Sequence, residues 1–138
     1  MPELFTTKVA IIVREDLAVW QKLNVTAFLA TGIAASAPEA LGEPYEDASG
    51  RRYSRLLGQP MLVFSATREQ LQAAHRAAVA RELTTAVYVA AMFTTGNDTD
   101  NRAAFRAEAP DALDLVGLAL RGERKGVDKA VKGLSLHT

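Results

Sequence analysis

Polar side chains that could hold a small anion follow two apolar segments of the chain. Lys22 and Asn24 come after the apolar run 9–13, and the polar run 94–98 follows the apolar run 84–90. An ammonium and an amide near the start of a helix can bind phosphate or carboxylate, helped by the helix dipole. We therefore predict a hydrogen-bonding ligand site, without a nucleophile, formed by Lys22, Asn24, Thr94, Thr95, Gly96, Asn97 and Asp98.

This site requires that the two apolar runs be parallel, neighbouring strands, because only then do their carboxyl ends share one edge of a sheet. Gly96 permits a turn with positive φ that exposes backbone N–H groups to a ligand. The alternative is structural. In that case Lys22 is solvated, Asn24 bonds only to nearby backbone, and the Asp, Asn and Thr side chains of the run 94–102 cap the start of a helix.

The chain contains no cysteine and two histidines, which excludes thiolate catalysis, disulfides and sulfur-ligated metals and argues against a multi-histidine metal site. We expect no metal and no cofactor, and no catalytic residue is identified. His75 lies four residues from both Leu71 and Val79, so we expect a partly buried structural histidine. His137 is one of the last two residues, where chains are often mobile.

The composition predicts one globular domain over residues 1–138, with 49% hydrophobic and 23% charged residues. Basic and acidic residues number 16 each, and this zero net charge argues against a dedicated nucleic-acid binder. Basic clusters at 51–55 and 121–132 are expected to be solvated faces rather than an RNA surface. The sequence has neither a signal-peptide pattern nor an apolar run of about 20 residues, so we predict a cytoplasmic protein that makes no membrane contact.

The order of predicted elements indicates an α/β fold. Apolar runs predict strands at 9–13, 60–64, 84–90 and 113–120. Helical spacing predicts helices from Leu17 to about Gly32, from the Thr67–Gln70 capping box to about Leu83, from the 94–102 loop through Phe105, and over 122–133. Asp16 is the expected N-cap of the first helix. This alternation predicts a single three-layer α/β/α domain with a mixed, mostly parallel central sheet.

A small β-hairpin is predicted as an insertion over residues 44–55. Asp47 and Gly50 occupy the favoured first and fourth places of a type I turn. Tyr45 and Tyr53 would then face each other across the two strands.

The segment Lys8-Val-Ala-Ile-Ile-Val-Arg-Glu-Asp-Leu17 resembles the opening strand of type II peptidyl-tRNA hydrolases, and the segments 58–64 and 115–136 resemble later parts of that family. The resemblance implies the peptidyl-tRNA hydrolase II-like fold and equates Lys22 with the lysine of the family. The family also has a histidine in its first helix, at a position that corresponds to Leu29 or Ala30 of this chain. The position of the family's glutamine corresponds to Thr26 or Ala27 of this chain, and residues 92–98 stand where the family has an Asp-Ala-Gly-Arg-Thr loop.

The Trp20–Asn24 segment, the tyrosine hairpin and the 94–102 loop are similar to an uncharacterised bacterial family with the same fold. That similarity implies a fold and no established activity. Three functions remain as hypotheses. The first is binding of a small polar or anionic ligand by a protein that lacks the hydrolase's catalytic histidine. The others are residual peptidyl-tRNA hydrolysis and a homodimeric interaction module without catalysis.

Overall fold

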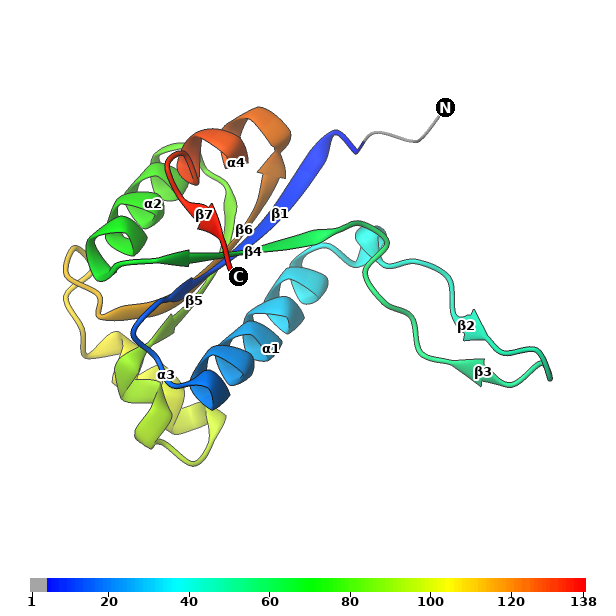
Figure 1. Ribbon diagram of the computed structural model, residues 1–138. Helices are drawn as coiled ribbons and strands as arrows, with labels where there is room; N and C mark the ends of the chain where they lie inside the picture. The colour runs from blue at the N-terminus through cyan, green and yellow to red at the C-terminus, as the bar shows by residue number, and fades with distance from the viewer. Residues whose placement is uncertain (1–4) are drawn as a thin grey trace.

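A five-stranded sheet in the order β5–β6–β1–β4–β7 forms the centre of the molecule (Figure 1). The computed structural model describes residues 5–138. The strands of this sheet are β1 (Thr7–Arg14), β4 (Met61–Ala66), β5 (Thr84–Val89), β6 (Leu115–Glu123) and β7 (Ser135–Leu136). The predicted mixed sheet is confirmed.

The expectation of mostly parallel pairing is wrong. β1 and β4 pair in parallel, whereas β1–β6, β5–β6 and β4–β7 are antiparallel. β6 is longer than the run 113–120 suggested, because the strand continues through the polar residues to Glu123. β7 was not predicted, since two residues of strand leave no periodic pattern to detect.

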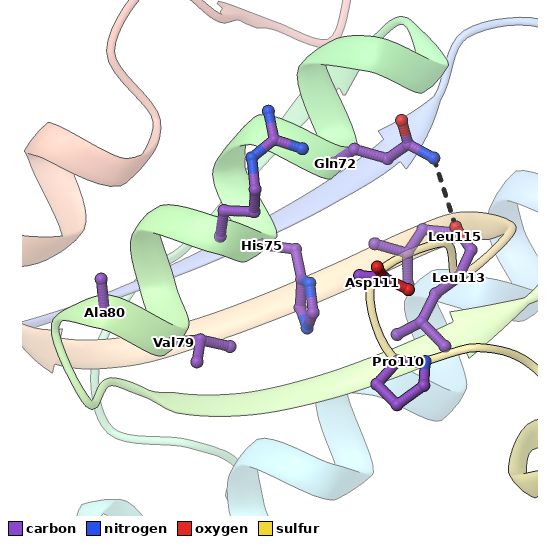
Figure 2. Close-up of a pocket in the computed structure, with 9 residues that line it drawn as sticks. Gln72, His75, Val79, Ala80, Pro110, Asp111, Leu113 and Leu115 are labelled. Carbon is purple, nitrogen blue, oxygen red and sulfur yellow. Dashed lines mark hydrogen bonds between the residues drawn. The ribbon is translucent and has the colours of Figure 1, made fainter.

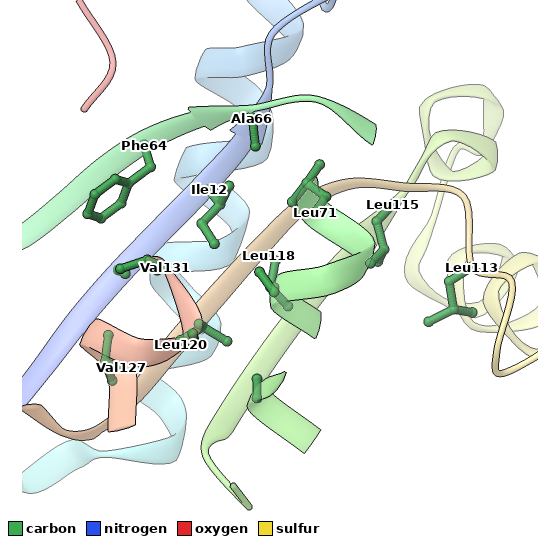
Figure 3. Close-up of a cluster of buried hydrophobic side chains, with 14 of the residues drawn as sticks. Ile12, Phe64, Ala66, Leu71, Leu113, Leu115, Leu118, Leu120, Val127 and Val131 are labelled. Carbon is green, nitrogen blue, oxygen red and sulfur yellow. The ribbon is translucent and has the colours of Figure 1, made fainter. Parts of the chain in front are cut away.

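Helices cover both faces of the sheet, which confirms the predicted three layers. α1 (Val19–Ser36) covers one face, and α2 (Arg68–Ala80) and α4 (Arg124–Ala130) cover the other (Figure 1). Alternate residues of β1 point to opposite faces, as a strand requires. Ile11 packs in the cluster beneath α1, while Ile12 packs with Leu71 of α2 and Val127 of α4 (Figure 3).

Close packing of α1 on β6 depends on Gly117. A Cβ atom added at this glycine would lie 2.3 Å from Val25 Cγ1 and 2.9 Å from Leu29 Cδ1. Both side chains belong to α1 and are buried. The absence of a side chain on β6 therefore lets α1 sit closer to the sheet than any other residue type would allow.

α1 begins later than the sequence suggested. Its N-cap is Ala18, whose N–H donates to the side-chain oxygen of Gln21 at 2.9 Å. Asp16 is not the N-cap, because its carboxylate instead accepts a hydrogen bond from Arg14 Nε at 2.7 Å. A charged neighbour on the preceding strand thus competes successfully with the helix start for this carboxylate.

The predicted start of α2 is confirmed. Thr67 Oγ1 accepts from Gln70 N–H at 3.1 Å, and the Gln70 side chain accepts from Thr67 N–H at 2.9 Å. α2 ends at Ala80 rather than near Leu83. The last helix ends at Ala130 rather than at Gly133, and Gly133, with φ +88°, lies in the turn that follows it.

The predicted hairpin is confirmed as β2 (Tyr45–Glu46) and β3 (Arg52–Tyr53), with the two tyrosines paired across the strands. The turn closes by a hydrogen bond from Gly50 N–H to Asp47 O at 3.0 Å. This hairpin projects away from the sheet and its helices (Figure 1).

Short segments complete the chain: the 3-10 turns η1 (Pro38–Ala40) and η2 (Ala90–Thr94), and the helix α3 (Asp98–Arg106). In residues 5–138, no helix combines the length and the apolar character needed to cross a bilayer.

Candidate functional site

The predicted ligand-site residues lie on two sides of α1. Lys22 Nζ is 3.2 Å from His137 Nε2, just beyond β7. The Trp20 ring packs edge-on against Phe93 of η2, with ring centroids 5.8 Å apart. Residues two apart on a helix point about 200° apart, so Lys22 faces away from the side on which η2 and the 94–98 loop lie.

The condition for a shared site is therefore not met. β6 lies between β5 and β1, so the strands that precede the two groups are not neighbours. Asn24 is half-buried on α1. The structure brings together Thr94, Thr95, Gly96, Asn97 and Asp98 as one loop, but it does not bring Lys22 to them.

Polar groups of the 94–98 loop are occupied in starting α3. Asn97 is the N-cap, and its side-chain oxygen accepts from Asp100 N–H at 2.8 Å. Thr94 and Thr95 donate their hydroxyls to backbone carbonyls three residues earlier. Asp98 forms an ion pair with Arg102 at 2.6 Å. These contacts match the structural alternative, and the acidic first turn of α3 opposes an anion.

The predicted positive-φ turn at Gly96 is wrong. Within the described part of the chain, the glycines with positive φ are Gly50 and Gly133. Residues 5–138 also contain no group of three or more histidine, aspartate or glutamate side chains placed to hold a metal ion.

The last residues are fixed against the edge of the sheet beside Lys22. His137 N–H donates to Val63 O at 2.9 Å, which extends the β4–β7 pairing by one residue. The exposed imidazole then meets the ammonium of Lys22. Sequence reasoning did not place His137 here, because the two-residue strand that carries it is too short to recognise.

A charged cluster at the end of β1 is internally neutralised. Arg14 bonds to Asp16 at 2.7 Å and to Asp114 at 3.2 Å, and Arg68 lies 3.6 Å from Asp114. Burial acts to lower the pKa of the Arg14 guanidinium, but the two carboxylates outweigh it and raise that pKa above its ordinary value. The cluster ties β1 to β6 and α2, and its charges are already paired.

A hollow surface region lies between α2 and α3, with His75 at its centre. A cavity of about 310 Å³ (Figure 2) adjoins a second of about 960 Å³, and the two share His75, Val79, Pro110 and Leu113 in their linings. We call the combined hollow the His75 cavity. Each of the two cavities, taken separately, falls within the roughly 300–1,000 Å³ that is usual for sites of small ligands.

The floor of the His75 cavity is apolar and its rim is basic. Phe105, Leu113 and Leu115 contribute apolar side chains. Arg76 and Arg106 stand at the rim, and within residues 5–138 neither guanidinium has a carboxylate within 4 Å.

Two further charged side chains at the rim are already engaged. Arg102 is paired with Asp98, and Glu108 accepts a hydrogen bond from Asp114 N–H at 2.7 Å. Asp111 also lines the cavity. The lining therefore carries three guanidiniums, of Arg76, Arg102 and Arg106, against the carboxylates of Glu108 and Asp111, an excess of one positive charge before the Asp98 partner of Arg102 is counted.

His75 is partly buried, as predicted, but its imidazole lines the cavity rather than the core. Burial, and then the positive charge of Arg76, lower the pKa of His75 below its ordinary value. The neutral imidazole offers one donor and one acceptor to a ligand. Gln72 is held by a hydrogen bond from its Nε2 to Leu113 O at 3.4 Å (Figure 2).

Comparison with known proteins identifies relatives without an assigned activity. The family model DUF2000, described as a protein of unknown function, matches residues 7–138. A solved structure, the protein of unknown function Atu0240 from Agrobacterium tumefaciens strain C58, is 49% identical with a TM-score of 0.94. That match covers 98% of this chain and 100% of the other. No curated protein matches the sequence.

The expected similarity to an uncharacterised bacterial family is confirmed by these matches. The peptidyl-tRNA hydrolase II-like fold is not confirmed.

Proposed function

Because the chain belongs to the DUF2000 family of proteins of unknown function, we propose a function from its own geometry: it binds a small anion with an apolar body in the His75 cavity. The observation that carries this proposal is that Arg76, on one part of the hollow, and Arg106, on the other, have no carboxylate partner within residues 5–138 and lie beside an apolar floor. A carboxylate that carries a ring or a short alkyl chain matches both features.

Physical chemistry favours an amphipathic ligand over a fully polar one. Phe105 and Leu113 offer apolar contact, which stabilises binding by about 25 cal/mol for each Å² removed from water. Guanidinium groups bind carboxylates in a planar, two-point geometry. The neutral His75 can donate a third hydrogen bond, or take up a proton when an anion arrives.

Benzoate is a suitable probe, with uncharged benzamide as its matched control. We expect benzoate to shift backbone amide signals of residues 72–80 and 102–113 in ¹H–¹⁵N NMR spectra, and benzamide to shift them less. Arg76→Gln and Arg106→Gln should each weaken binding by about 2- to 5-fold, the range for a partly exposed ion pair.

Arg51→Gln is the control variant, since Arg51 lies in the exposed hairpin outside the cavity. Equal binding of benzoate and benzamide, or equal weakening by Arg51→Gln, would contradict the proposal.

The predicted site around Lys22 remains a separate proposal for a small polar anion such as phosphate. Lys22 would bind it together with His137, whereas Asn24, two residues further along α1, points about 200° away from Lys22 around the helix. Phosphate should then shift the signals of residues 20–26 and 135–138, and Lys22→Ala should abolish that shift.

Residual peptidyl-tRNA hydrolysis is the second candidate function, and the position of His137 favours it. Leu29, one of the two positions where the resemblance expects a histidine, is buried in the core and offers no base. His137 instead brings an imidazole to Lys22, and a positioned base contributes typically about 10²–10⁴-fold in rate.

An assay with diacetyl-lysyl-tRNA tests this candidate. We expect weak turnover that His137→Gln and Lys22→Met remove and that His75→Gln leaves unchanged. No turnover above buffer would end this proposal. The cytoplasmic location stays a prediction.

A further inference from the structure

The solvent-facing side of α1 is apolar. We define the α1 outer face as Val19, Trp20, Leu23, Ala27 and Phe28. Its four large side chains are 73, 61, 67 and 56% exposed in that order, with Ala27 also exposed between them. Large apolar side chains on a helix normally face the core, yet these lie on the side of α1 opposite to the residues Val25, Leu29 and Ile33 that its own sheet covers.

Little on α1 offsets this exposure. Lys22 is the single charged residue among its 18, and it points toward His137 rather than outward. The Thr31 hydroxyl donates to Phe28 O at 2.6 Å, so it is satisfied within the helix. Trp20 is held in place by its edge-on contact with Phe93. The α1 outer face is therefore a largely apolar surface without charge, in which the half-buried amide of Asn24 is the polar side chain between Trp20 and Phe28.

A second exposed apolar feature is the projecting hairpin. We call residues 42–57 the arm. Tyr45, Tyr53 and Leu56 in it are 58, 53 and 59% exposed. The arm extends away from α1 of its own chain (Figure 1). An isolated two-stranded hairpin is marginally stable in water, so a surface outside its own chain is expected to support it.

We propose that a second copy of the chain covers the α1 outer face, with the arm of each copy lying across that face of its partner. A two-fold axis makes such contacts reciprocal, so one arrangement covers both features in both copies. The net charge of zero and the uncharged α1 outer face leave no large electrostatic repulsion between copies. Tyrosine in the arm suits this role because it is enriched at protein interfaces.

The available area is adequate for a stable dimer. An aromatic side chain buries about 150–250 Å² in full, so Trp20, Phe28 and the two arm tyrosines, each over half exposed, offer roughly 100 Å² apiece. Adding the three exposed aliphatic side chains brings the total to roughly 700 Å², close to the ~800 Å² per partner of a standard interface.

Sedimentation equilibrium tests the oligomeric state. We expect the purified chain to sediment at twice its 14.8 kDa mass at micromolar concentrations. Leu23→Glu should weaken the dimer at least about 10-fold, because it places a charge in an apolar contact. Leu136→Glu is the matched control, since Leu136 is 56% exposed and pairs across the strands with Phe64, whose side chain lies on the α2 and α4 face of the sheet, opposite α1. A wild-type monomer at millimolar concentration, or a dimer unaffected by Leu23→Glu, would overturn the proposal.

The arm contact has its own test, made simple because the chain contains no cysteine. Chains carrying Tyr53→Cys are mixed with chains carrying Leu23→Cys under mild oxidation, so a mixed disulfide reports contact between copies only. We expect a yield well above that of Tyr53→Cys mixed with Leu136→Cys. Equal yields would show that the arm does not lie on its partner's α1. Circular dichroism of each variant checks that the fold is retained.

Discussion

Replacing Gly117 by alanine is expected to push α1 away from the sheet and to lower the free energy of unfolding. Carbon atoms in ordinary contact lie about 3.5–4.0 Å apart. The added Cβ would lie 2.3 Å from Val25 Cγ1 and 2.9 Å from Leu29 Cδ1. Both side chains are almost fully buried, so neither can turn into solvent to make room.

Overpacking of this kind costs typically about 1–3 kcal/mol. Alanine also restricts the unfolded chain more than glycine does, which offsets about 0.5–1 kcal/mol. We therefore expect Gly117→Ala to lower the free energy of unfolding by about 1–2 kcal/mol. For a domain of this size, the melting temperature should fall by roughly 2–4 °C per kcal/mol.

Urea unfolding followed by circular dichroism measures the effect, and a double variant identifies its cause. In Val25→Ala/Gly117→Ala the clashing Cγ1 is absent, so the two changes should destabilise by at least about 1 kcal/mol less than their sum. Gly96→Ala is the matched control, because no atom lies within 4 Å of its added Cβ. Additive energies, or equal losses for Gly117→Ala and Gly96→Ala, would refute the steric account.

Three further changes test the local structure and its response to pH. Thr67→Ala should lower the free energy of unfolding by about 1 kcal/mol in urea unfolding, because it removes the capping bond to Gln70 N–H; an unchanged midpoint would contradict this. Asn97→Ala removes the N-cap of α3 and should lower the free energy of unfolding by about 0.5–2 kcal/mol in the same assay. An unchanged free energy of unfolding would contradict this structural role of Asn97. Because the pKa of His75 is lowered by folding, the unfolded chain binds a proton at this imidazole more readily than the folded chain does. The contribution of His75 to the free energy of unfolding is therefore complete above the ordinary pKa of about 6.5 and is lost as the pH falls toward the pKa of the folded state. Unfolding at pH 7.5 and 5.5 should show a smaller loss in His75→Gln than in the unaltered chain, and equal losses would count against this origin.

Much of the fold could be predicted from local patterns. The apolar run 9–13 marks the central strand, and the Thr67–Gln70 box marks the start of α2, because both signals lie within a few residues of the chain. The turn from Asp47 to Gly50 was equally local. The prediction that Asp16 is the N-cap of α1 was wrong, because side-chain geometry that the sequence does not show decides whether this carboxylate bonds to the helix start or to Arg14.

The candidate sites depended on contacts between distant segments. Lys22 was recognised as a binding residue, but its neighbour His137 lies 115 positions away along the chain. His75 looked like an ordinary structural histidine, since its cavity exists only where α3 and the segment 108–115 pack beside α2.

The sequence by itself determined which segments form strands and helices and that both faces of the sheet are covered, because hydrophobic periodicity and capping act over a few residues. Only the tertiary structure decided strand order. By inserting β6 between β5 and β1 it separated Lys22 from the 94–98 loop. It also decided which apolar residues stay exposed: the α1 outer face has the composition of a core helix, but the sheet covers one side of it. Burial depends on the position of every other element, and no local pattern contains that information.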